Sequence, residues 1–358
     1  MNRKGLFSGL LWTLALITLI TWPLLGQVVI EEREGGGGMP PLFEATEPAP
    51  DVDLSTEVSQ TLDQAEAEEL ERVRIEDGLE PRHCVPLPGG LDHVASGTGA
   101  RNAGHGTIRL RGAPATAVAV RAILYWGEIV SQLSVPATDT INFEGHPVTG
   151  SLIGTAGQPC WNGAGIFAAY RADVLRYLPG AIDGDYQVDG LSSAVIDGHD
   201  PWVPADTRLP MAQGASLVVI YADQSVPATS RVYIHEGPWL FTSNNLFLTH
   251  ALAPALPGNA LLRHTRIGGD GQVGGSVSPT FATSRENTSI NALQIQGPGS
   301  VGNDSDWNGS DGGPLNQLWD TRTTNAPGSI PVGAAAYRVS YTNVFDCVNP
   351  VVHVLTGR

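Results

Sequence analysis

From about residue 84 onward, the chain consists of short apolar runs separated by turn residues. Arg231–His235 alternates polar and apolar side chains with a period of two, the pattern of a half-buried strand. An acidic residue followed by Gly marks the turns between runs. The pattern predicts strands at Ile123–Trp126, Ser216–Tyr221, Arg231–His235, Ala292–Ile295, Tyr337–Tyr341 and Val351–Leu355, with turns at Glu144-Gly145, Asp183-Gly184, Asp197-Gly198 and Asp270-Gly271.

Helices contribute little to this part of the chain. One helical turn or short helix is predicted at Tyr170–Tyr177, and no long amphipathic pattern follows residue 85, which argues against a βαβ fold. Short strands with frequent turns predict an all-β fold. Because about 275 residues exceed what one sandwich needs, we expect two jelly-roll-like β-sandwich domains, residues 84–238 and 239–358. Arg231–His235 would be the last strand of the first domain.

The N-terminus has a different pattern. Arg3 and Lys4 precede Leu6–Leu25, an uncharged run with almost no polar side chains. A positive flank before an apolar run is typical of export signals, and a helix of this length would span a bilayer at about 1.5 Å per residue. Residues 1–26 are therefore predicted to be a signal peptide or an uncleaved membrane anchor. Both alternatives stay open, because Leu24 departs from the small-residue cleavage pattern and the run also contains a proline.

Residues 27–83 are predicted to form an acidic spacer. The net charge of the chain is -16, and acidic residues outnumber basic ones by 12 between residues 27 and 82. Gly35–Gly38 predicts flexibility, and the prolines of Met39–Pro50 predict an extended chain. Within residues 53–77, apolar residues recur at spacings of 3, 4 and 8, which predicts an amphipathic helix. Such a helix would either dock or oligomerise, or remain a partly formed solvated spacer, since isolated helices of this length are marginal in water.

The charge of the chain narrows the class of partner. Lys4 is the only lysine in the sequence, and the net charge is strongly negative. Phosphate binding needs a basic face, so the sequence argues against nucleic acid as a partner. The expected location is extracellular, at the cell surface or in the periplasm, with membrane contact only through residues 1–26 if they are not cleaved.

Five segments occur in an order that resembles one protein family. They are Ala122–Trp126, Ala172–Val174, Gly214–Tyr221, Leu318–Thr321 and Asp346-Cys347. Together they are similar to the uncharacterised β-rich extracellular domain found in bacterial and archaeal surface proteins, often beside adhesin-like repeats. The resemblance spans roughly residues 105–355 and implies a secreted β-sandwich protein of unknown function. It implies no catalytic residue, and the acidic spacer has no counterpart in it.

A candidate metal loop lies at Asn303–Gly312, which contains Asp-x-Asp-x-Asn-Gly, the front half of an EF-hand-type calcium loop. Alternate side chains in such a tight turn point oxygen atoms at one centre, and Ca²⁺ accepts hard oxygen ligands. The twelfth position is Leu315 instead of Glu, so Asp311 or Asp320 would have to complete the shell. The predicted ligands of a structural Ca²⁺ are Asp304, Asp306, Asn308, Ser310 and Asp311. The alternative is an ordinary surface loop whose side chains cap local turns.

The three cysteines, Cys84, Cys160 and Cys347, predict one disulfide and one remaining thiol in an oxidising compartment. A bond between Cys84 and Cys160 would lie within the first domain, whereas either pairing with Cys347 would bridge the two domains. All three pairings stay open. A metal-binding or catalytic cysteine has less support, because no Cys-x-x-Cys occurs.

Catalytic motifs are weak. The sequence contains neither Gly-x-Ser-x-Gly nor His-Glu-x-x-His. The nine histidines are scattered singly, and we interpret each as a surface or hydrogen-bonded residue. Asp183 and Asp185 could do acid and base chemistry, but such a pair has meaning only once its separation is known.

The sequence therefore predicts a non-catalytic secreted or cell-surface structural or adhesive protein, with cell-surface proteins or polysaccharide as partners. One alternative is a carbohydrate-binding module, in which exposed indoles stack on sugar rings. Its candidates are Trp161, Trp202, Trp239 and Trp307, which could instead plug the ends of the sandwiches. A second alternative is a secreted hydrolase that uses carboxylates.

Overall fold

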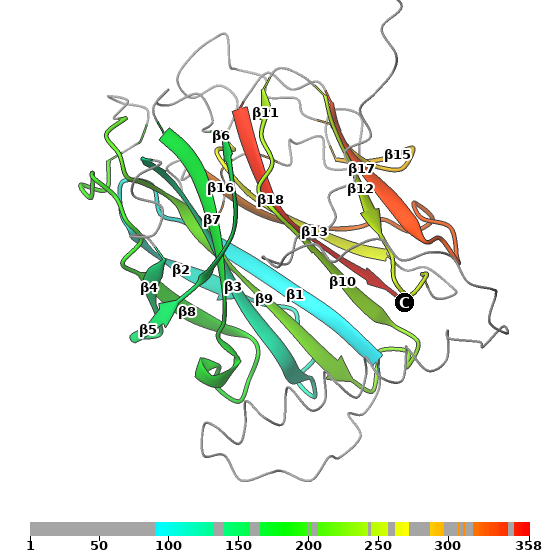
Figure 1. Cartoon of the computed structure of the whole chain (residues 1–358). Coiled ribbons are helices and arrows are strands. Elements are labelled where there is room, and N and C mark those ends of the chain that lie inside the picture. Colours follow the sequence, from blue (N-terminus) through cyan, green and yellow to red (C-terminus); the bar gives the residue numbers. More distant parts are fainter. Residues whose placement is uncertain are drawn as a thin grey trace, which may run out of the picture. The chain divides into compact units, whose positions relative to one another are not determined.

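The computed structural model describes residues 90–131, 139–157, 165–199, 201, 207–242, 245–256, 262–271, 287–296, 307, 309, 311, 318–342 and 347–358. All of them belong to one compact unit, His83–Arg358, and form an all-β fold of four antiparallel sheets (Figure 1). The predicted signal or anchor, the acidic spacer and its helix lie outside the described residues. In the described ranges no helix has the length and hydropathy needed to cross a membrane.

The strands β1 to β9 build two of the sheets. The first inner sheet has the order β1 (Gly90–Gly99), β9 (Met211–Asp223), β3 (Val118–Ser131), β7 (Gly165–Asp173), β6 (Ser151–Gly157). The first outer sheet has the order β2 (His105–Leu110), β8 (Gly184–Asp189), β4 (Thr140–Phe143), β5 (His146–Thr149). A short 3-10 helix, η2 (Leu175–Tyr177), lies between β7 and β8 in the chain.

The strands β10 to β18 build the other two sheets. The second inner sheet has the order β10 (Arg231–Glu236), β18 (Cys347–Gly357), β13 (Leu262–Gly269), β16 (Trp319–Asn325), and β11 (Phe241–Thr242) also pairs with β18. The second outer sheet has the order β12 (Leu246–Ala251), β17 (Ala336–Thr342), β14 (Asn287–Ile290), β15 (Leu293–Gln296).

Three hydrophobic clusters show which faces of the sheets meet. The first contains Phe143 of the first outer sheet and Trp126 of the first inner sheet. The second joins the two inner sheets through residues such as Val218 and Ile267. The third contains Tyr341 of the second outer sheet and side chains of the second inner sheet. The four sheets therefore follow one another as first outer, first inner, second inner and second outer, an order that can be followed in Figure 1.

The central strands have the composition that this position requires. Every residue of β9 is buried, because β9 lies between β1 and β3 and both faces of its sheet are covered. The continuous apolar run Ser216–Tyr221 suits such a strand, and each fully buried large apolar side chain stabilises the fold by about 1.5–3 kcal/mol. The predicted turn at Glu144-Gly145 is confirmed: both residues have positive φ, 52° and 77°, as a two-residue hairpin turn between β4 and β5 demands.

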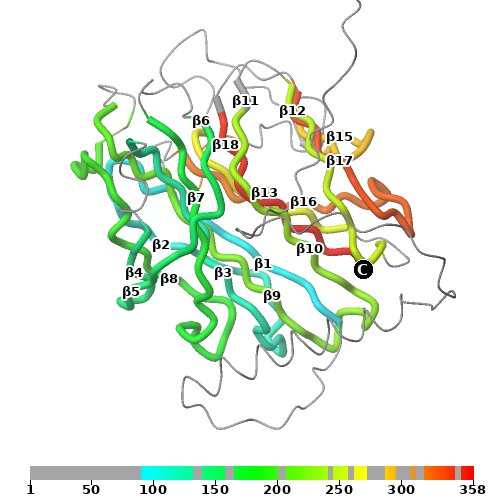
Figure 2. The backbone as a smooth tube through the Cα atoms, viewed as in Figure 1, coloured from blue at the N-terminus to red at the C-terminus, as the bar shows by residue number. Residues whose placement is uncertain are grey.

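Two predictions about elements need correction. Arg231–His235 forms a strand, but β10 pairs with β18 of the second inner sheet and does not close the first sandwich; Figure 2 shows the two strands side by side. The helix predicted at Tyr170–Tyr177 is only partly right, because Tyr170 pairs with Trp126 inside β7 and only the η2 turn is helical. The domain limits at residues 84, 238 and 358 stay a prediction.

Two glycines make room for a tryptophan between the inner sheets. Gly127 and Gly214 are paired across β3 and β9. A Cβ atom at Gly214 would lie 2.4 Å from Cγ of Trp319, and one at Gly127 would lie 2.9 Å from Cζ3 of the same ring. The indole of Trp319 is fully buried, and its Nε1 donates to Oγ of Ser216 at 2.8 Å. The absence of side chains at two paired positions thus lets β16 of the second inner sheet approach the first.

Candidate functional site

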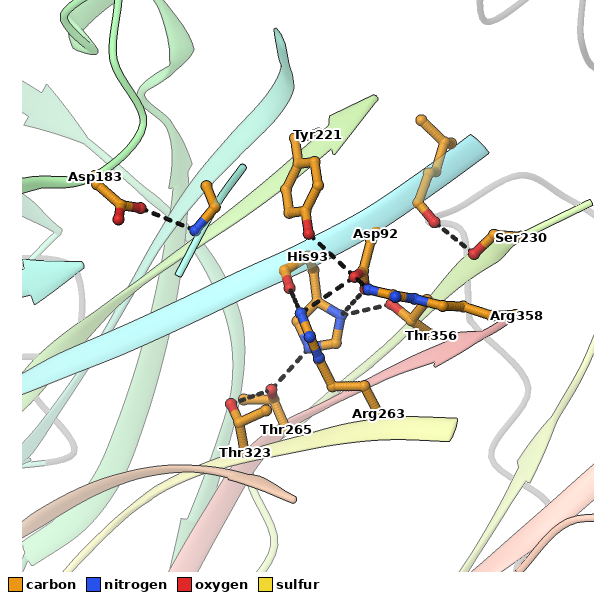
Figure 3. A network of polar contacts seen from close by, with 12 residues as sticks. Asp92, His93, Asp183, Tyr221, Ser230, Arg263, Thr265, Thr323, Thr356 and Arg358 are labelled. Carbon is orange, nitrogen blue, oxygen red and sulfur yellow. Dashed lines mark hydrogen bonds and ion pairs between the residues drawn. The ribbon is translucent and has the colours of Figure 1, made fainter. Parts of the chain in front are cut away.

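A buried carboxylate ties the first inner sheet to the second (Figure 3). Asp92 lies on β1 with no solvent exposure. Its Oδ2 is 3.1 Å from a guanidinium nitrogen of Arg263 on β13, and Arg358, which follows β18, donates to the same oxygen. The hydroxyl of Tyr221 on β9 donates to it at 3.1 Å. One carboxylate therefore connects four segments that are far apart in the sequence.

The next residue of β1 extends the network across the inner sheets. The imidazole of His93 is fully buried, with Nδ1 2.6 Å from Oγ1 of Thr356 and Nε2 2.8 Å from Oγ1 of Thr265. Thr265 in turn lies 2.7 Å from Oγ1 of Thr323. Arg263 also donates to the backbone carbonyl of His93 at 2.9 Å. Figure 3 shows this chain of polar contacts running from β1 to β13, β16 and β18.

The residue types of this network resemble those of a hydrolytic site, but its environment opposes catalysis. Burial, and then the charge of Arg263, lower the pKa of His93 to about 3. An imidazole with so low a pKa is a poor general base near neutral pH. Asp92, His93, Thr265 and Thr356 all lack solvent exposure, so a substrate cannot reach them. The network therefore holds the two inner sheets together.

A second polar cluster, the four-histidine cluster, lies between the second inner and second outer sheets. It consists of His235 on β10, His250 on β12, His264 on β13 and His353 on β18. Nε2 of His250 is 2.7 Å from Nδ1 of His353, and the rings of His235 and His250 stack with centroids 4.3 Å apart. The rings of His264 and His353 are 5.4 Å apart.

Aromatic side chains complete this cluster. The hydroxyl of Tyr341 is 2.6 Å from Nε2 of His353. Trp239 stacks on His353 with ring centroids 5.5 Å apart, and Tyr337 contacts His250 at 5.2 Å. Across the described part of the chain, no group of three His, Cys, Asp or Glu side chains is arranged to hold a metal ion. The cluster in this conformation is an aromatic core made partly of imidazoles.

Burial dominates the electrostatics of the cluster. It lowers the pKa of His235 to about 4 and, with a smaller effect from His235, that of His250 to about 3. Burial also places the pKa of His264 and of His353 well below the usual value, with further lowering from Arg266 and from neighbouring histidines. All four imidazoles are therefore neutral at pH 7.

The predicted calcium loop is only partly covered by the structure. Asp304, Asp306, Asn308 and Ser310 lie outside the described residues. Asp311 is described: its backbone carbonyl accepts from Gly99, and burial raises the pKa of its carboxyl to about 7 against the opposing hydrogen bond from Thr321.

The two residues considered for completing the calcium shell do not share a surface. Asp320 accepts a hydrogen bond from the backbone of Gly309 at 2.9 Å, whereas Asp311 is hydrogen-bonded to Thr321. Successive side chains of a strand point to opposite faces. Asp320 and Thr321 follow each other in β16, so Asp311 and Asp320 make their contacts on opposite faces of this sheet.

The structure describes only some of the predicted cysteines and tryptophans. Cys84 and Cys160 lie outside the described residues, and Cys347 begins β18, where its backbone pairs with Thr242. Trp161 and Trp202 also lie outside the described residues. Trp307 is 1% exposed and belongs to the third hydrophobic cluster, and Trp239 stacks on His353.

The predicted carboxylate pair has structural partners. Asp183 accepts hydrogen bonds from the backbone nitrogen atoms of Gly112 and Ala113, both at 2.9 Å. Asp185 pairs with Arg111 at the surface. Each carboxylate therefore anchors the chain segment that follows β2.

The four-histidine cluster is the main feature that the sequence analysis missed. Single histidines far apart in the chain give no motif, but strand alternation holds a signal. His235 shares a strand face with Tyr233, His264 with Leu262, and His353 with Leu355. Each of these apolar neighbours belongs to the third hydrophobic cluster. Histidine at an inward-facing strand position therefore indicates a buried imidazole.

Comparisons with known proteins give no family. No family model and no curated protein matches the chain. Among solved structures, the 3.5 Å cryo-EM structure of the Sputnik virophage aligns over 88% of this chain and 90% of that chain, with 10% identity and a TM-score of 0.20. Dimeric latent PorU from Porphyromonas gingivalis aligns over 76% of this chain and 24% of that chain, with 10% identity and a TM-score of 0.22. This chain thus spans about a quarter of PorU, and neither TM-score supports an argument about function.

Proposed function

We propose that this chain is an exported, non-catalytic structural or adhesive protein, in which a jelly-roll-like double sandwich is carried on an acidic spacer behind a signal peptide or membrane anchor. The observation that carries the proposal is the position of the polar clusters. Asp92, His93, His264 and His353 are all fully buried and occupied in joining sheets. Chemistry-bearing side chains thus stabilise the body, and its outer surface is left for contacts with cell-surface proteins or polysaccharide.

The alternatives have less support. A carbohydrate-binding module needs exposed indoles, but Trp307 is buried and Trp239 packs on an imidazole. A carboxylate-dependent hydrolase needs two acids at a shared cleft, but Asp183 and Asp185 each hold a backbone segment or a surface ion pair. In the part of the chain that the structure describes, neither alternative has an observation in its favour.

The test of export uses intact cells of the producing organism. We expect proteinase added to the medium to degrade the full-length chain with a C-terminal epitope, while a cytoplasmic protein survives. Purified chain should also sediment with isolated cell envelopes. The mass of the mature N-terminus then distinguishes a cleaved signal near residue 26 from an anchor. Full protection of the chain in intact cells, with degradation only after lysis, would show that it is not at the surface.

Calcium is proposed as a structural ion of the loop that contains Asp304 and Asp306. An ion at about 100 times its dissociation constant stabilises a fold by about 2.7 kcal/mol, so calcium should raise the melting temperature of the full chain and chelator should reverse the rise. Replacing both aspartates by Ala is expected to abolish this response without loss of the folded circular dichroism spectrum. A double variant that responds to calcium as strongly as the wild type would place the ion elsewhere.

A further inference from the structure

The four-histidine cluster joins two sheets through bonds that depend on protonation. His250 and Tyr341 belong to the second outer sheet, and His353 belongs to the second inner sheet. Both side chains from the outer sheet bind His353, one at each ring nitrogen, at 2.7 and 2.6 Å. A neutral imidazole offers one donor and one acceptor, whereas a protonated imidazole offers two donors and no acceptor. Protonation of both His250 and His353 would therefore turn the bond between them into a contact between two donors.

The described charges that act on the cluster do not favour a protonated imidazole. Arg266 of β13 already brings a cation, and its Nη1 lies 3.2 Å from Nδ1 of His264. Among the described residues, the charges that shift the pKa values of these imidazoles are Arg266 and other histidines, and all of them lower the values. The neighbours from β17 are Tyr337, whose pKa is raised by burial, and Tyr341.

The two sides of the second inner sheet differ in how many buried imidazoles they contact. His93 lies on the opposite side, between the inner sheets, and is a single imidazole held by Thr265 and Thr356. The side that faces the second outer sheet carries three imidazoles and Arg266, and His250 of the second outer sheet packs against them. Among the described sheets the second outer sheet is the last layer, and it packs on the second inner sheet through the third hydrophobic cluster.

We propose that the four-histidine cluster is an acid-sensitive latch that holds the second outer sheet onto the second inner sheet at neutral pH and releases it in mildly acidic surroundings. Release exposes the imidazoles to water, where they protonate. The closed state is then favoured above about pH 6.5, the ordinary pKa of histidine, and is progressively disfavoured as the pH falls below it. Release would uncover the apolar faces of β12 and β17, which offers a surface that is sealed at neutral pH.

The sign and size of the effect follow from proton linkage. The pKa values in the closed state are about 4 for His235 and about 3 for His250, so only the open state binds protons in the range between those values and pH 6.5. For each imidazole that release exposes, lowering the pH from 7 to 5.5 should raise the opening equilibrium constant on the order of 10-fold. Several imidazoles acting together would multiply this factor.

Hydrogen–deuterium exchange on the full-length chain at pH 7 and pH 5.5, corrected for the intrinsic exchange rates, tests the latch. We expect protection of the β12 and β17 amides to fall by at least about 10-fold at pH 5.5, while β3 and β9 keep theirs. Equal losses in all four strands would indicate global unfolding and overturn the proposal, and so would unchanged protection of β12 and β17.

Substitution of single rings separates the latch from general acid sensitivity. His250→Phe keeps a ring against His235 but removes one titrating group, and should reduce the pH dependence of β12 and β17 exchange on the order of 10-fold. His146→Phe is the matched control, because exposed His146 stacks on Tyr177 at 4.5 Å, and it should change nothing. If His250→Phe does not fold, His235→Phe at the less buried end of the cluster makes the same comparison. A folded variant with the full wild-type pH dependence would overturn the proposal.

Discussion

Replacing Asp92 by Asn is expected to lower the free energy of unfolding by about 3–5 kcal/mol, the usual cost of removing one partner of a buried ion pair. The carboxylate is fully buried, whereas the side chains of its partners Arg263 and Arg358 are 27% and 25% exposed. The amide keeps the shape of the carboxylate but leaves two guanidinium groups close together without a counter-charge. Partial hydration of both arginines should place the loss in the lower half of that range.

Urea denaturation of the full-length chain measures this loss. Asp185→Asn is the matched control, because it breaks the surface pair between Asp185 and Arg111. The side chain of Arg111 is 56% exposed and that of Asp185 is 51% exposed. Exposed pairs contribute about 0–1 kcal/mol. Tyr221→Phe removes only a neutral donor to Asp92 and should cost about 1 kcal/mol. If Asp92→Asn costs no more than Asp185→Asn, the buried carboxylate does not hold the inner sheets together.

Trp319→Ala is expected to cost about 3–5 kcal/mol, as large-to-small changes of fully buried aromatic residues do. The indole fills the space above Gly127 and Gly214 between the two inner sheets. Its removal leaves a cavity that neither glycine can fill, and it also leaves Oγ of Ser216 without its indole donor. Closing this cavity would require the two inner sheets to move closer to each other.

The comparison for Trp319→Ala combines two further variants. Trp319→Phe keeps most of the apolar volume and loses the Nε1 donor, so it should be less destabilising than the alanine variant. Val332→Ala truncates a side chain that is 60% exposed, and surface changes of this kind are usually within about 0.5 kcal/mol. In thermal and urea unfolding, the loss of stability should be largest for Trp319→Ala, smaller for Trp319→Phe and smallest for Val332→Ala. A Trp319→Ala effect as small as that of Val332→Ala would mean that the inner sheets are not held by this side chain.

Local pattern predicted a large part of the fold. The apolar run at Ser216–Tyr221 and the alternation at Tyr337–Tyr341 each correspond to a strand, because side-chain periodicity is a property of neighbouring residues. The positive φ values at Glu144-Gly145 follow from local chemistry in the same way. The predicted all-β class is confirmed by four antiparallel sheets, although the central strands β3, β9 and β18 are longer than the predicted runs.

Membership of a sheet did not follow from local pattern. Arg231–His235 has the same alternation whichever strand it pairs with, and its pairing with β18 is decided by residues more than a hundred positions later. The same limit applies to the helix expected at Tyr170–Tyr177, where pairing with β3 extends β7 through Asp173. In both cases, pairing with a strand that is distant in the sequence decided the outcome.

The sequence by itself determined the all-β class, the strand periodicity and the turn chemistry, since each depends on residues close together in the chain. Only the tertiary structure decided which polar residues meet. His93 contacts Thr356 and Thr265 across 263 and 172 positions, and four solitary histidines come together from four strands. The physical reason is that burial and hydrogen bonding act between residues that are neighbours in space, and the order of the sheets sets which residues those are.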